Sequence, residues 1–258
     1  MSEKYITKHP YLAAVIAALI CTFLTAVGSA AAQVAELAEV PAYLVMTASV
    51  VLSILVGLWL LRRSRISSEE AGFRRPASGS LRSVWFCVPL LLLEIIPLVA
   101  YGPDAFTRPG TEYAVLTLFT VVVGLNEELY FRGLAFSFLA RRSRKQAVIG
   151  SSIVFGVLHA ANALSGTNPL EVLLQIAFAI LAGLMLALLV SITRSLWIGI
   201  VWHAVHNFLS FSTEMVFDQT ALMVVSAQVV ILLIFAVGLW KRGTTAAYTE
   251  PKLAPALA

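Results

Sequence analysis

The chain of 258 residues contains little charge and little cysteine. Only 12% of its residues are Asp, Glu, Lys or Arg, whereas 59% are hydrophobic, which is more apolar sequence than a soluble core needs. The basic residues are spread over separate segments and are not interleaved with aromatics, so no nucleic-acid partner is indicated. Both cysteines, Cys21 and Cys87, lie within apolar runs, so neither a disulfide framework nor a cysteine-based metal site is indicated. The composition is typical of a polytopic membrane protein.

Eight apolar runs are long enough, or nearly long enough, to cross a bilayer at about 1.5 Å of helix rise per residue. They predict an all-α fold, a polytopic membrane helix bundle of about eight transmembrane helices that forms a single domain over residues 1–258. The runs are Tyr11–Ala32, Ala42–Leu61, Val84–Tyr101, Tyr113–Ala140, Ala147–Leu164, Leu170–Ile192, Leu196–Ser212 and Ala221–Trp240, of which the fifth and seventh are short.

The positive charges predict the orientation of this bundle. If the eight runs alternate in direction, every Lys and Arg falls on the same side except Arg108 and the intramembrane Arg132. By the positive-inside rule that side is cytoplasmic, which places both termini in the cytoplasm of a multi-pass cell-membrane protein. The Arg-rich segment 62–83 is then a cytoplasmic loop, which could contact anionic lipids.

Charged residues interrupt the fourth apolar run, Tyr113–Ala140, within the stretch Asn126–Gly133. Ionisable groups at that depth cost several kcal/mol each unless they face a partner or a wet cavity, so they mark a functional site. Glu128 and Arg132 are four residues apart, which is the spacing of an intrahelical ion pair. Glu127 lies about 100° around the helix from Glu128 and points elsewhere. One carboxylate is therefore interpreted as structural and the other as free to act.

Two later runs also carry polar side chains. His159 lies near the end of the fifth run, and His203 and Asn207, which share one helix face, lie in the seventh. Counted at the helical rise from the nearest basic residue on the predicted cytoplasmic side, Glu127, His159 and Asn207 each lie about 20 Å in, and His203 about 13 Å in. Isolated interhelix contacts remain an alternative, but three helices that reach one level predict a shared polar site.

Two further polar residues are interpreted as structural. Glu94 is a buried acid three residues before Pro97, and a proline in a spanning helix frees a backbone carbonyl that needs another partner. His206 lies on a different helix face from His203 and is interpreted as local packing.

The predicted site has the groups of a hydrolase that uses water as its nucleophile. A free carboxylate beside a neutral imidazole can hold and deprotonate water, and Asn207 and His203 are the donor types of an oxyanion hole. The sequence contains no His-Glu-x-x-His helix, no Gly-x-Ser-x-Gly elbow and no lysine near this level. Zinc held by Glu127, His159 and His203 remains an alternative, since two histidines and a glutamate form a known zinc site.

These residues fall into three motifs that resemble those of the CAAX protease and bacteriocin-processing family, also called type II CAAX prenyl endopeptidases or Abi proteins. The motifs are Glu127-Glu128-x-x-x-Arg132, Phe155-x-x-x-His159 and His203-x-x-x-Asn207. They occur in the family's order on separate helices, and residues 113–212 form the catalytic core that contains them. The first two runs and the Arg-rich segment do not contribute to the resemblance.

The resemblance implies an intramembrane glutamate protease whose water-filled cavity opens toward the cytoplasm. By the matching positions, Glu127 and His159 would activate water, and His203 and Asn207 would form the oxyanion hole. The supporting residues would be Glu128 and Arg132, which hold the first motif, and Phe155, a packing or substrate-contact residue in the cavity wall.

The implied partners are membrane lipids and a peptide or prenylated protein substrate, with no cofactor, and the sequence leaves the oligomeric state open. A non-catalytic scaffold, an immunity protein or a transporter could use the same polar cluster. The hydropathy pattern contains no obvious internal repeat, which disfavours the inverted-repeat transporters.

Overall fold

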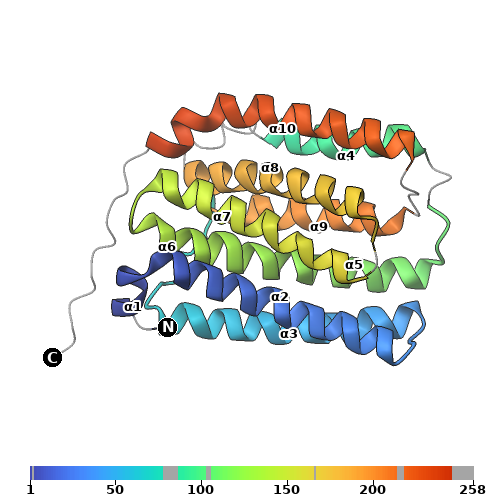
Figure 1. The fold of residues 1–258 in the computed structure, drawn as a ribbon, viewed down its shortest axis with the longest axis horizontal. Helices are drawn as coiled ribbons and strands as arrows, with labels where there is room; N and C mark the ends of the chain where they lie inside the picture. Colours follow the sequence, from blue (N-terminus) through green and yellow to red (C-terminus); the bar gives the residue numbers. More distant parts are fainter. Residues whose placement is uncertain (2, 78–86, 103–105, 166, 214–217, 246–258) are drawn as a thin grey trace.

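The computed structural model describes residues 1, 3–77, 87–102, 106–165, 167–213 and 218–245. Within these ranges the regular structure is helical and contains no strand. The helices lie side by side along the long axis of the molecule (Figure 1). In chain order they are α1 (Glu3–Lys8), α2 (Pro10–Val34), α3 (Glu39–Arg63), α4 (Val88–Tyr101), α5 (Gly110–Glu128), η3 (Leu129–Ala135), α6 (Phe136–Ala140), α7 (Arg144–Leu158), η4 (His159–Ser165), α8 (Pro169–Thr193), α9 (Trp197–Ser212) and α10 (Gln219–Thr245), where η3 is a π-helix and η4 a 3₁₀-helix.

The helices that carry the three motifs lie in the middle of the bundle. α5 packs against α9, and α7 packs against α8. In the view of Figure 1, α2 and α3 cover these helices on one side, and α4 and α10 lie on the opposite side. The predicted site is therefore enclosed by helices that contain none of the motif residues.

Within the described residues, six helical segments are long and apolar enough to cross a membrane, which makes the chain a multi-pass membrane protein of the all-α class. They are Pro10–Val34, Glu39–Arg63, Gly110–Ala140, Arg144–Ala163, Pro169–Thr193 and Gln219–Thr245. The other two predicted spans correspond to the shorter helices α4, of 14 residues, and α9, of 16 residues. Residues 84–86 of the third predicted span lie outside the described ranges. The count of eight crossings therefore stays a prediction.

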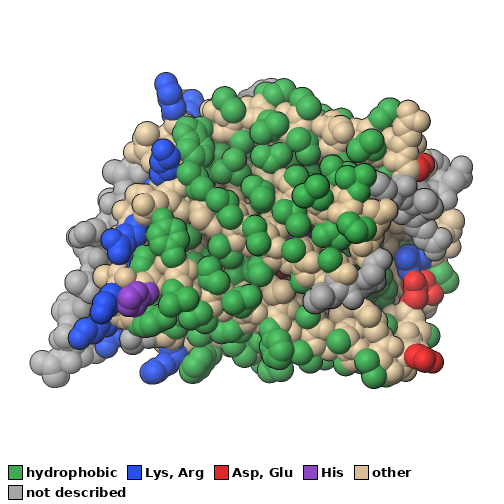
Figure 2. Space-filling model, in the orientation of Figure 1, with side chains coloured by type: hydrophobic (Ala, Val, Ile, Leu, Met, Phe, Trp, Pro, Cys, Tyr) green, Lys and Arg blue, Asp and Glu red, His purple; other side chains and the backbone are tan. Residues whose placement is uncertain are grey.

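The two ends of the bundle carry opposite charge on the face drawn in Figure 2. Lys and Arg gather at the end where α3 and α10 finish and α7 begins, whereas Asp and Glu lie at the other end. At the basic end, Arg141 donates a hydrogen bond to Thr7 Oγ1 and Arg144 donates one to the carbonyl of Ser191. This is the charge asymmetry from which the cytoplasmic orientation was predicted, and the orientation itself stays a prediction.

Arg108, which the charge pattern left unexplained, lies before α5 and pairs with acids. Its Nη1 donates a hydrogen bond to Glu39 Oε2 at the start of α3 and lies 3.9 Å from Glu112 Oε2. The hydrogen bond that Arg108 donates to Glu39 raises the pKa of Arg108 above its ordinary value, so the guanidinium stays charged. Arg108 therefore ties α3 to α5 at the acidic end.

The described part of the Arg-rich loop, residues 64–77, folds back onto the connection between α8 and α9. Leu196 N donates to the carbonyl of Gly72 over 2.8 Å, and Ser195 Oγ donates to the carbonyl of Arg74 over 2.7 Å. Gly72 has φ of +101°, a conformation that favours glycine. The loop thus holds the start of α9, while its residues 78–83 lie outside the described part of the chain.

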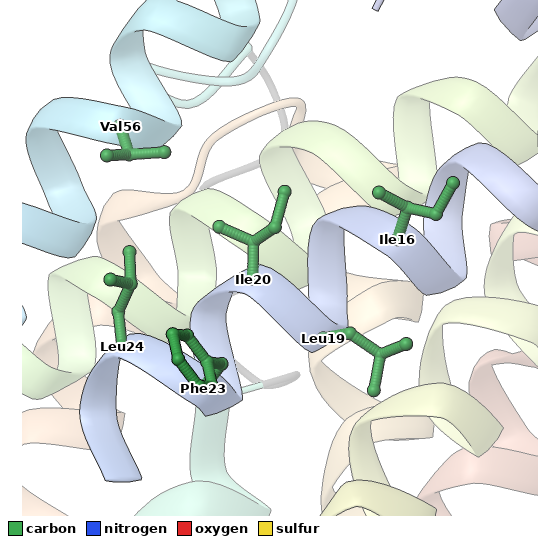
Figure 3. Close-up of a pocket in the computed structure, with 6 residues that line it drawn as sticks. All are labelled: Ile16, Leu19, Ile20, Phe23, Leu24 and Val56. Carbon is green, nitrogen blue, oxygen red and sulfur yellow. The ribbon is translucent and has the colours of Figure 1, made fainter. Parts of the chain in front are cut away.

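An open apolar groove lies between α2 and α3 (Figure 3), with a volume of about 410 Å³. Its lining consists of Ile16, Leu19, Ile20, Phe23 and Leu24 of α2 and Val56 of α3. None of these side chains can transfer a proton or bind a metal, so the groove is a surface for apolar chains.

Candidate active site

The first motif spans the junction between α5 and the π-helix η3. α5 ends with Glu127 and Glu128, and η3 contains Arg132, which is 1% exposed. A π-helix inside a longer helix is rare and is found frequently at functional sites. The charged residues of the motif therefore lie where the regular α-helical geometry changes.

Glu128 and Arg132 form the intrahelical ion pair that their spacing predicts. Arg132 Nη1 lies 2.7 Å from Glu128 Oε1, and neither side chain has any exposed surface. The guanidinium carbon of Arg132 also lies 4.4 Å from the centre of the Phe155 ring, a cation–π contact. The contact between Arg132 and Phe155 joins the first motif to α7, which carries the second motif.

His203 on α9 lies between the two glutamates. Its Nε2 is 2.9 Å from Glu127 Oε2, and its Nδ1 is 3.2 Å from Glu128 Oε1. A neutral imidazole has one N–H, so only the imidazolium form can donate toward both carboxylates. Two carboxylates would then be balanced by Arg132 and His203. A cluster with no net charge is the arrangement that burial favours.

His159, the first residue of η4, faces its own helix with one nitrogen. Its Nδ1 lies 2.9 Å from the carbonyl oxygen of Phe155, which can only accept a hydrogen bond. Nδ1 therefore carries the proton, and in the neutral ring Nε2 keeps a lone pair. That lone pair could accept a proton or hold a water molecule.

Phe155 is the aromatic centre of the site and is 3% exposed. Its ring lies edge-on to both histidines, with ring centres 4.8 Å from His159 and 5.7 Å from His203. Phe131 of η3 packs against it with centres 4.9 Å apart. The structure thus places Phe155 as a spacer between the two histidines, a packing position in the wall of the site.

Two of the predicted site residues, His159 and Asn207, make no direct hydrogen bond to Glu127. Among the described residues, no hydrogen bond joins Glu127 to His159; the close partner of Glu127 is His203. Asn207 is partly buried one turn after His203 on α9, and no hydrogen bond of its side chain is found within the described ranges. The amide of Asn207 therefore has donors to offer to a bound group.

Two glycines that the sequence analysis did not single out make room for this cluster. A Cβ on Gly199 would lie 2.8 Å from Glu128 Oε2, and a Cβ on Gly124 would lie 3.0 Å from Ala204 N. The first glycine makes space for the buried carboxylate, and the second lets α5 and α9 approach closely. Gly199 precedes His203 by one helical turn. A small residue at that spacing is the feature of the sequence that could have pointed to this position.

Asn126, next to Glu127, is also fixed by a contact that sequence reasoning missed. Its Nδ2 donates to the sulfur of Cys21 on α2 over 3.2 Å, and both residues are buried. Both cysteines are free thiols. The contact ties the catalytic end of α5 to the covering helix α2.

The described residues contain no group of three His, Cys, Asp or Glu side chains arranged to hold a metal ion. Both ring nitrogens of His203 face carboxylates. Zinc held by Glu127, His159 and His203 stays the alternative to a site without metal, and chelation tests it.

Comparison with known proteins adds one match. Residues 109–209 match a protein-family model described as type II CAAX prenyl endopeptidase Rce1-like. The matched range includes all seven candidate site residues, from Glu127 to Asn207. No curated protein matches the chain, and no solved structure matches it.

Proposed function

We propose that the chain, whose residues 109–209 match the type II CAAX prenyl endopeptidase Rce1-like family model, is an intramembrane glutamate endopeptidase. The observation that carries the proposal is the position of His203 between Glu127 and Glu128, beside the buried Arg132. Only one of these carboxylates, Glu127, is partly exposed, with 21% of its side chain accessible. A partly accessible acid in a buried ionic cluster is a suitable general base.

In the proposed reaction, a water molecule lies between Glu127 and His159. The water oxygen attacks the carbonyl carbon of the substrate's peptide bond, and Glu127 takes one proton from that water. The lone pair of His159 Nε2 holds the water's other hydrogen, which fixes the direction of attack. The carbonyl oxygen becomes the oxyanion of a tetrahedral intermediate.

The proximity of Glu127 to His203 gives this step a second effect. Once Glu127 is protonated, it attracts the Nε2–H of His203 less strongly than the carboxylate does. The same N–H can then donate to the oxyanion, together with the amide of Asn207. When the intermediate collapses, Glu127 returns its proton to the leaving nitrogen, the C–N bond breaks, and a carboxylic acid and an amine are released.

The supporting residues keep these groups in place. Glu128 and Arg132 hold His203 and the first motif through the ion pair, and Phe155 separates the two histidines. The proposed steps use no metal ion, because side chains activate the water nucleophile and supply the oxyanion donors.

The substrate class follows from the setting of the site. A site enclosed by membrane-spanning helices receives peptides that are themselves membrane-associated, so we propose a membrane-associated or lipidated peptide, prenylation included, as substrate. Membrane lipids surround the protein, and its proposed location is the cell membrane.

The test compares wild type with Glu127→Gln on quenched peptides with and without a lipid group, in detergent and with or without a chelator. We expect Glu127→Gln to lower turnover by about 10²–10⁴-fold, the usual contribution of a general base. Glu171→Gln, a change of the same kind at an exposed position on α8, is the matched control and should cleave like wild type.

Each outcome has a separate meaning. Cleavage that requires Glu127 and persists with chelator supports the glutamate mechanism. Loss of cleavage on chelation would replace it with a metalloprotease mechanism. If wild type cleaves no peptide and instead moves protons or solutes across vesicles, the transporter alternative is correct.

A further inference from the structure

A second acid–imidazole pair lies outside the candidate active site. His206 Nδ1 on α9 is 3.0 Å from Glu94 Oε1 on α4, and the Glu94 side chain is only 9% exposed. Its other oxygen, Oε2, is buried and has no hydrogen-bond partner within the described part of the chain. A buried acid inside a membrane helix is costly, so its contact with α9 needs an explanation.

His206 is also fixed by two aromatic rings. Its ring stacks on Trp202 with centres 5.0 Å apart and on Phe178 of α8 with centres 5.3 Å apart. The indole nitrogen of Trp202 donates in turn to the carbonyl of Leu90 on α4 over 3.2 Å. Trp202 and His206 thus attach the same face of α9 to α4.

The residues of α9 that belong to the active site are direct neighbours of this attachment. Asn207 follows His206 in sequence, and His203 lies three residues before it, about 60° around the helix. The rings of Trp202 and His203 have centres 6.0 Å apart. A rotation of α9 about its axis that moves His203 therefore also moves His206 relative to Glu94.

α9 is consequently held from two sides. On one side His203 faces Glu127 and Glu128 of α5, and on the other side His206 faces Glu94 of α4. The pull toward α5 changes during the proposed reaction, because Glu127 becomes neutral when it takes a proton. The contact with α4 does not take part in that step and stays as it is.

We propose that Glu94 and His206 are positioning residues that keep α9 in the rotation at which His203 and Asn207 reach the oxyanion. This inference rests on the proposed endopeptidase function for its effect on turnover. The positioning itself, the coupling of Glu94 to His203 through α9, is independent of which reaction the site performs.

Three variants separate positioning from stability. Glu94→Gln keeps an oxygen that accepts from His206 Nδ1–H, whereas Glu94→Leu removes it. The double variant Glu94→Leu/His206→Phe replaces the pair with apolar groups and keeps an aromatic ring against Trp202. Replacing both partners of a buried pair is often neutral for stability, so the double variant remains available if Glu94→Leu alone fails to fold. Ile95→Ala, at the neighbouring half-exposed position, is the matched control.

The kinetic measurement follows kcat and KM for each folded variant on the best peptide. We expect the double variant, and Glu94→Leu where it folds, to lower kcat at least tenfold with KM within about twofold of wild type. Glu94→Gln and Ile95→Ala should stay within about threefold of the wild-type kcat. A double variant with the melting temperature and kcat of wild type would overturn the inference, since the pair would then be structural only.

A second measurement needs no substrate. The chain contains four histidines, so selective ¹⁵N labelling gives a spectrum in which the His203 signals can be assigned with one histidine variant at a time. We expect the His203 signals to shift in the double variant and to stay in place in Ile95→Ala. Unchanged His203 signals in the double variant would refute the coupling. If the His203 signals shift in a protein that cleaves no peptide, the coupling is supported and only the endopeptidase function is contradicted.

Discussion

At the scale of single residues, Glu128 illustrates how little freedom the site allows. One of its oxygens, Oε1, lies 2.7 Å from Arg132 and 3.2 Å from His203, while Oε2 is buried without a hydrogen-bond partner among the described residues. Gly199 lies against that second oxygen. The carboxylate is therefore confined by Gly199 at one oxygen and by Arg132 and His203 at the other.

Gly199→Ala tests this arrangement. The new Cβ would lie 2.8 Å from Glu128 Oε2, a distance that forces a displacement. We expect the free energy of unfolding to fall by about 1–3 kcal/mol, the usual cost of overpacking, and activity to fall at least tenfold. Thermal unfolding in detergent and the peptide assay measure the two effects.

Gly238→Ala is the control for this substitution. It lies within α10, where an added Cβ would meet no atom within 4 Å, so alanine should be neutral or stabilising by up to about 1 kcal/mol. Equal losses in both variants would mean that a helical glycine, and not the room for Glu128, is what matters.

The residue-level contacts were predictable only within one helix. The ion pair of Glu128 and Arg132 follows from a spacing of four residues, which any helix brings together. The contact of His203 with Glu127 depends on how α9 is rotated against α5, and Gly124 and Gly199 allow that close approach. The same limit explains why Glu94 and His206, each interpreted as structural, were not expected to meet.

At the scale of elements, α4 is a helix with a proline in its interior. Pro97 lies within it and has no N–H to donate, so the carbonyl of Leu93, four residues earlier, loses its helical partner. Gln228 on α10 donates to that carbonyl over 2.7 Å and is 5% exposed. The carbonyl that the proline was expected to free is thus bound by the neighbouring helix.

A double-mutant cycle at this contact is the test. We expect Gln228→Leu to cost about 1–3 kcal/mol of unfolding free energy, because the Leu93 carbonyl is left buried without a donor. With Pro97→Ala in the background, the backbone N–H at position 97 can serve that carbonyl, and the cost of Gln228→Leu should fall by more than half. Additive effects of the two changes would show that the amide of Gln228 is not serving that carbonyl.

The elements themselves were largely predictable because long apolar runs in this chain have few alternatives to a helix. Within the described ranges all eight runs coincide with helices, but the run Tyr113–Ala140 contains the π-helix η3, for which the sequence gives no signal. The i→i+5 pattern depends on the packing around Arg132 and not on local propensity. The fold-back of residues 64–77 onto the start of α9 also depends on contacts between distant segments.

At the scale of the whole molecule, the distribution of charge along the long axis is the basis of the predicted orientation in the membrane. Basic residues gather at one end and acidic residues at the other on the face of Figure 2, and Arg108 at the acidic end is paired with Glu39. Arg108 is a single exception, and the prediction that the basic end faces the cytoplasm depends on the excess of Lys and Arg at that end.

Labelling of single cysteines checks the orientation. In a background with Cys21 and Cys87 replaced by serine, Ala35→Cys in the turn after α2 should react with a membrane-impermeant thiol reagent in intact cells. Arg142→Cys, at an exposed position between α6 and α7, should react only after the membrane is opened. Reaction of both from outside would mean that the number of crossings between them is even and that the predicted topology is wrong.

The groove between α2 and α3 affects every stability measurement on the purified protein. An open apolar hollow of about 410 Å³ on a helix bundle in a membrane is filled by the chains of the surrounding amphiphiles. We expect lipid or detergent tails to pack against this face of α2, the helix whose Cys21 contacts Asn126 beside Glu127. Tails of different length and branching should therefore change the melting temperature of the purified protein.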